Sequence, residues 1–156
     1  MRGGPFYVMK RSLFFFLFLS VPLSAADKPV DLVRYRQSVM KAMGSHMNAA
    51  SLIVKKLVSD RSHLPGHAAA IRELGTGLAA YFPPGSGPDK VKTGAMMAIW
   101  QKLPEFRVAA EEFHGEAVKL AEVSKHGDAK AFDAQFARVG AACNSCHDRF
   151  RIQDAD

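Results

Sequence analysis

The 156-residue sequence contains only two cysteines, and it has no long apolar run beyond its first 26 residues. A structural zinc site needs four ligands and usually a second cysteine pair, so two cysteines argue against one. The two cysteines lie three residues apart, a spacing that fits poorly with the separation and dihedral angle of a disulfide. No run of Lys and Arg is interleaved with aromatic residues, which argues against a nucleic-acid partner.

The long apolar run at the N-terminus is typical of a secretory signal peptide. The basic pair Lys10-Arg11 precedes a run of Phe and Leu, which ends in small residues before Asp27. The run is shorter than the about 20 apolar residues that a membrane-spanning helix needs. We therefore predict a signal peptide at residues 1–26, cleaved on export to the periplasm, and one domain at residues 27–156 without membrane insertion.

The charge of the chain depends on this cleavage. The full sequence has 21 basic and 15 acidic residues, which gives a formal charge of +6. Residues 1–26 hold three of the basic residues and none of the acidic ones, so the mature chain keeps 18 basic against 15 acidic groups, or +3. The basic character of the sequence is therefore partly a property of the signal peptide.

Five residues near the C-terminus, Cys143-Asn144-Ser145-Cys146-His147, form the strongest motif in the sequence. C-x-x-C-H is the attachment signature of a c-type haem. On a helix, positions i, i+3 and i+4 share a face, so both cysteines can form thioethers with the haem vinyl groups while His147 points at the iron. A thioredoxin-like pair would need a βαβ context, but the preceding segment has a helical pattern. The motif predicts one covalent haem c, attached through Cys143 and Cys146, with His147 as axial ligand.

Apolar residues recur at every third or fourth position along the mature chain, which indicates helices. A segment with three prolines and two glycines, at 82–88, predicts a loop that continues in irregular form to residue 100. Gly127 is expected to end one helix, and Asp128 to cap the helix that carries the haem motif. No strand-like alternation is present, so we predict an all-α helix bundle. The other expected helices span about 30–59, 65–81 and 105–125.

The remaining histidines show no spacing typical of a second metal site. His63 and His67 are four residues apart, but Pro65 lies between them. Proline inside a helix removes a hydrogen bond and clashes with the preceding turn. We therefore expect no regular helix through both histidines and no metal bound by them.

The mature chain resembles the class II cytochromes c, which include cytochrome c′ and its low-spin relatives. The resemblance rests on the C-terminal position of the haem motif, on Phe150-Arg151 after it, on the YRQSVM string at 35–40, and on Ile99-Trp100. It implies an antiparallel four-helix bundle that holds the haem between its helices, attached to the last one. Family members often dimerise through the first two helices, which makes a homodimer a further expectation, although the bundle core explains the same apolar stripe.

The resemblance also implies residues that contact the haem. Arg36 and Gln37 match positions of the first helix that contact the haem and its propionates, and the planar fork of an arginine suits a carboxylate. Arg151 resembles the basic residue that follows the proximal histidine, so it is expected to tune the electrostatics near His147. Thr93, in the long loop, is expected to approach a propionate.

Met40 carries the functional prediction, because in this family its position faces the iron opposite the histidine. Low-spin members use a methionine there as sixth ligand, which raises the reduction potential. We predict a monohaem electron carrier with His147 and Met40 as axial ligands, serving unidentified redox partner proteins and without enzymatic activity. A haem peroxidase is disfavoured because no distal His/Arg pair is expected. The alternative is a five-coordinate cytochrome c′ that binds NO or CO.

Overall fold

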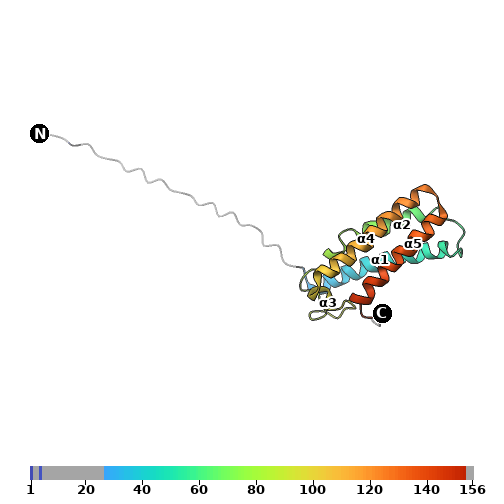
Figure 1. The fold of residues 1–156 in the computed structure, drawn as a ribbon. Coiled ribbons are helices and arrows are strands. Elements are labelled where there is room, and N and C mark those ends of the chain that lie inside the picture. The colour runs from blue at the N-terminus through green and yellow to red at the C-terminus, as the bar shows by residue number, and fades with distance from the viewer. Residues whose placement is uncertain (2–3, 5–26, 154–156) are drawn as a thin grey trace.

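The computed structural model describes residues 1, 4 and 27–153. Its long helices are α1 (Pro29–Val54), α2 (Leu64–Gly75), α4 (Leu103–Val123) and α5 (Ala129–Phe150), and the short ones are η1 (Leu78–Tyr81), α3 (Ala98–Gln101) and η2 (Ser124–His126). The long helices lie side by side (Figure 1). The predicted all-α, antiparallel four-helix bundle is confirmed. None of the helices among the described residues combines the length and the apolar character needed to cross a membrane.

The helix ends follow local backbone chemistry. Gly127 has a φ of 71° and ends η2, and the Asp128 carboxylate accepts a hydrogen bond from the Ala131 N–H at 3.0 Å, as expected for a cap. The predicted second helix is shorter than expected, because Gly77 takes a φ of 61° and a 3₁₀ turn follows it. The first helix is also shorter, ending at Val54 rather than near residue 59.

Pro65 does not interrupt α2. It lies in the first turn of the helix, where its missing N–H costs no intrahelical hydrogen bond. The His67 N–H donates to the His63 carbonyl oxygen at 3.1 Å, so both residues belong to one continuous turn. His63 is the N-cap and lies outside α2, so the regular helix does not run through both histidines, as expected.

The helices pack in the order α1, α2, α4, α5, which leaves the first and last helices apart. α4 packs against α2 and α5, and α2 packs against α1. The core between these pairs includes Ile71, Phe113, Leu120 and Val139, each at most 3% exposed. Within the described residues, α1 and α5 approach each other much less closely. The fold therefore leaves a space between α1 and α5.

The loop between η1 and α3 is tied to the end of α5. The Met96 N–H donates to the Phe150 carbonyl oxygen at 2.9 Å, and the Ile152 N–H donates to the Gly94 carbonyl oxygen at 2.8 Å. These hydrogen bonds flank an antiparallel bridge between Ala95 and Arg151. They hold the loop across one end of the space between α1 and α5.

Candidate functional site

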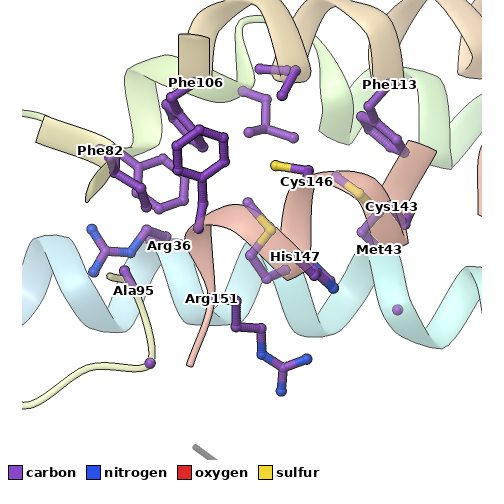
Figure 2. A pocket seen from close by; sticks show the side chains of 18 of the residues that line it. Arg36, Met43, Phe82, Ala95, Phe106, Phe113, Cys143, Cys146, His147 and Arg151 are labelled. Carbon is purple, nitrogen blue, oxygen red and sulfur yellow. The ribbon is translucent and has the colours of Figure 1, made fainter. Parts of the chain in front are cut away.

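A cavity of about 790 Å³ fills the space between α1 and α5. Small-molecule sites usually measure about 300–1,000 Å³, so the cavity is large enough for a cofactor. Its wall is mostly apolar, and Figure 2 shows phenylalanine side chains pointing into it. The large apolar residues of the wall include Met43, Phe82, Ile99, Phe106, Phe113 and Phe150.

The C-x-x-C-H motif lies on α5, and Cys143, Cys146 and His147 all line the cavity. Their shared face follows from the i, i+3, i+4 spacing on a regular helix. Figure 2 shows the three side chains leaving α5 in the space between α1 and α4. Both cysteines are free thiols and half-buried. The structure thus brings the predicted attachment residues and axial ligand to one cavity wall.

The cavity changes the acid–base chemistry of these three groups. Burial, followed by the proximity of Cys146, raises the pKa of the Cys143 thiol to about 11. Burial also raises the pKa of the Cys146 thiol. Partial desolvation, followed by the charge of Arg151, lowers the pKa of His147, although the residue is exposed. Both effects favour the neutral imidazole, the form that binds a metal.

On the α1 side of the cavity, opposite the C-x-x-C-H motif, the lining includes three methionines. Met40, Met43 and Met47 line the cavity on successive turns of this helix. Met43 is 6% exposed and belongs to the buried core, and the half-buried Met40 and Met47 pack against that core. Flexible thioethers suit such irregular apolar surfaces.

Arg36 is buried at the rim of the cavity, with 2% of its surface exposed. Its Nη1 donates to the Ser86 carbonyl oxygen at 3.2 Å and to Ser86 Oγ at 3.0 Å. Its Nη2 donates to the same carbonyl oxygen at 3.2 Å and to Thr93 Oγ1 at 3.0 Å. The guanidinium also lies over the Phe82 ring, 4.7 Å from its centroid. Arg36 therefore fastens the loop to α1.

Four residues were predicted to contact the haem beside the motif, namely Arg36, Gln37, Thr93 and Arg151. All four line the cavity. Arg36 and Thr93 are hydrogen-bonded to each other there. Their contacts with a haem propionate stay predictions.

Ser86 supports the site through Arg36, and the sequence did not indicate it. It is fully buried, and its Oγ donates to the Pro83 carbonyl oxygen at 2.8 Å while accepting from Arg36. Trp100 Nε1 donates to the same Pro83 oxygen at 3.1 Å. A serine between glycines in a proline-rich loop carries no local signal of burial. Its role becomes visible only when the loop is folded against α1.

The residues of the cavity fit a covalently attached haem. Two thiols and a neutral imidazole stand on one helix, which supplies two attachment atoms and one axial ligand. The apolar walls match the porphyrin ring, and Arg36 and Arg151 place positive charge among the residues that line the cavity. Among the described residues, no group of three or more His, Cys, Asp or Glu side chains could hold a metal ion instead.

Comparisons with known proteins agree with this fit. The family profile described as Cytochrome C' matches residues 31–151. A curated cytochrome c' from Rhodospirillum rubrum is 34% identical over 127 residues, which cover 81% of this chain and 85% of the relative. A solved nitric oxide complex of a leucine-to-alanine mutant of cytochrome c prime from Alcaligenes xylosoxidans has a TM-score of 0.75 and 30% identity, over 83% of this chain and all of that chain. A carbon monoxide-bound leucine-to-glycine variant of the same protein has a TM-score of 0.73 over 81% of this chain and 98% of that chain.

These likenesses overturn the low-spin prediction. Cytochromes c′ are typically five-coordinate, so the prediction of an electron carrier with Met40 as sixth iron ligand is wrong. The spacing on α1 brings a thioether to the cavity wall, but it does not decide whether the sulfur reaches bonding distance or packs against the core. Since the family profile and the relatives match most of the mature chain, the protein belongs to the cytochrome c′ family, whose members carry one covalently attached haem c per chain.

Proposed function

We propose that this protein is a five-coordinate cytochrome c′ that binds nitric oxide or carbon monoxide. The observation that carries the proposal is the methionine-rich stretch of α1, Met40, Met43 and Met47, which lines the cavity opposite the motif. The chain is also similar to a protein solved with NO and with CO. When bound, haem c would supply an iron that can take such a diatomic ligand. An apolar wall admits a small neutral gas more readily than an ion, because an ion would lose its hydration there.

We further propose a division of roles among the residues of the cavity. Cys143 and Cys146 carry the two thioether bonds, and the neutral ring of His147 provides the protein ligand. Arg36 holds the loop over the cavity end through Ser86 and Thr93. Met40, on the α1 wall of the cavity, would limit the room for a ligand.

The chain is proposed to bind its ligand without turning it over. Peroxide chemistry would require a distal acid–base group, for which histidine is the usual choice. Among the described residues that line the cavity, His147 is the one histidine. The guanidinium of Arg36, one turn before Met40 on α1, is already engaged by Ser86 and Thr93.

Export to the periplasm is part of the same proposal. The predicted signal peptide at 1–26 falls on residues that, apart from 1 and 4, lie outside those the structure describes. Its support is the layout of Lys10-Arg11, the apolar run and the small residues before Asp27. The domain boundaries at 27–156, the homodimer and the redox partner proteins also stay predictions.

Optical spectroscopy of the purified haem-loaded protein tests the proposed function. We expect broad, high-spin spectra in the oxidised and reduced states, and a new low-spin spectrum when CO or NO is added to the reduced protein. A sharp, strong α band in the reduced protein, together with no response to CO, would contradict the proposal. Acid-acetone extraction of the same sample should leave the haem on the polypeptide.

Met40→Ala is expected to raise the affinity for CO by about tenfold, which corresponds to about 1.4 kcal/mol. The substitution removes a half-buried side chain from the wall opposite His147, so the ligand no longer has to displace it. The spectrum without ligand should stay high-spin. Equilibrium CO titration of the reduced protein measures the change.

Met96→Ala is the matched control, because Met96 is 37% exposed and lies outside the cavity wall. Equal affinities in the two variants would remove Met40 from the proposed ligand site.

A further inference from the structure

Two histidines from different helices meet on the side of the bundle where α1 packs against α2. His46 Nδ1 of α1 lies 3.0 Å from His67 Nδ1 of α2, and the ring centroids are 5.3 Å apart with the rings inclined at 59°. Both side chains are half-buried, so solvent reaches the pair. Neither residue lines the haem cavity described above. The function proposed for that cavity makes no use of this pair.

The separation of the two nitrogens fits two adjacent positions around a metal ion. With metal–nitrogen bonds of about 2.0–2.1 Å, two nitrogens 3.0 Å apart subtend about 91–97° at the metal. A tetrahedral ion such as zinc prefers a wider angle, whereas a square-planar or tetragonal ion takes cis ligands at about 90°. This geometry, with imidazole nitrogens, is typical of Cu(II) and Ni(II).

The electrostatics of the pair favour a metal over a second proton. The contact at 3.0 Å is a hydrogen bond when one Nδ1 carries a proton and the other accepts it. Partial burial, followed by the charges of His46 and His63, lowers the pKa of His67. This shift favours the neutral ring of His67, and a metal ion can take the place of the proton that the two rings share.

We propose that His46 and His67 form a bidentate site for Cu(II) or Ni(II) that links α1 to α2. Between residues 27 and 153, no group of three or more His, Cys, Asp or Glu side chains gathers around a common point, so the protein provides two ligands. Water or a small exogenous ligand completes the coordination. His63 lies one turn before His67, but its side chain is 77% exposed and faces Asp60 at 3.9 Å.

Titration of the oxidised, haem-loaded mature protein with Cu(II) tests the site. We expect one equivalent to bind, and the Cu(II) electron paramagnetic resonance spectrum to show two nitrogen ligands. His46→Gln and His67→Gln should each weaken binding by at least about tenfold, or about 1.4 kcal/mol. Because the metal binds the folded protein, Cu(II) should also raise the Tm of the wild type and leave the Tm of His46→Gln unchanged.

His63→Gln is the matched control, since it removes a neighbouring imidazole from the same helix but not from the pair. It should retain the affinity and the Tm shift of the wild type. Binding weakened equally by His63→Gln and His67→Gln, with His46→Gln unaffected, would assign the metal to α2 alone and overturn the proposal. So would the absence of saturable binding by the wild type. Circular dichroism and the unchanged haem spectrum establish that each variant is folded.

Discussion

Replacing Cys143 and Cys146 together by alanine is expected to abolish covalent haem attachment, so that acid acetone extracts all remaining haem. The two thiols supply the attachment atoms on α5, and the described residues contain no other cysteine. The measurement is the fraction of haem that stays with the polypeptide after extraction and denaturing electrophoresis.

The same double variant is expected to lose its fixed tertiary packing. Without the haem, the apolar side chains that line the cavity of about 790 Å³ lose a packing partner and contact water. Since the net stability of a domain is only about 5–15 kcal/mol, this loss is large enough to disorder the helices around the cavity. Near-ultraviolet circular dichroism should therefore decrease strongly, while far-ultraviolet helicity is partly retained.

Two single variants serve as controls for this experiment. Ser145→Ala changes an exposed residue between the two cysteines and preserves the motif, so haem attachment should be normal. Cys143→Ala alone leaves one thiol, and a single thioether to Cys146 should keep part of the haem attached. Full retention of covalent haem by the double variant would refute the assignment of both residues.

Arg36→Ala is expected to lower the free energy of unfolding by about 3 kcal/mol. The substitution removes hydrogen bonds from a charged donor, each worth about 1.5–3 kcal/mol when its buried acceptor is left unpaired. The acceptors are Ser86 and Thr93, and the stacking over Phe82 is lost as well. Urea unfolding of the haem-loaded protein, followed by circular dichroism, measures the loss.

Arg34→Ala provides the comparison, because Arg34 lies on the same helix with its side chain 75% exposed and pairs only loosely with Asp31 at 3.6 Å. An exposed ion pair contributes about 0–1 kcal/mol, so this variant should be close to the wild type. Arg36→Lys should fall between the two, since it keeps the charge but not the planar fork. A loss in Arg36→Ala no larger than in Arg34→Ala would show that Arg36 does not hold the loop.

Local spacing accounted for most of the helical architecture. The three-and-four repeat of apolar residues predicted all the long helices, and the Gly127 stop and the Asp128 cap are confirmed because a left-handed glycine and a capping carboxylate act within one turn. Pro65 was expected to begin the second helix, and it stands in the first turn of α2, where its missing N–H costs no intrahelical hydrogen bond.

The prediction that Met40 binds the iron was wrong, because helical spacing places a side chain on a face but does not fix its distance to a metal. A methionine one turn after Arg36 was expected to face the iron, and Met40 does line the cavity. Its bond to a metal depends on the distance between two helices that are far apart in the sequence. The relatives of the chain, and not its helical pattern, corrected the functional prediction.

The sequence by itself determined that the chain is helical, that its last helix presents two cysteines and a histidine on one face, and that this face is chemically suited to a haem c. These features depend on residues within one or two helical turns, so local spacing is sufficient to derive them. Only the tertiary structure decided that the cavity opens between α1 and α5, that Arg36 finds partners 50 and 57 residues away, and that His46 meets His67. Those contacts result from the way separate helices pack, and no local pattern in the chain encodes the distance between two helices.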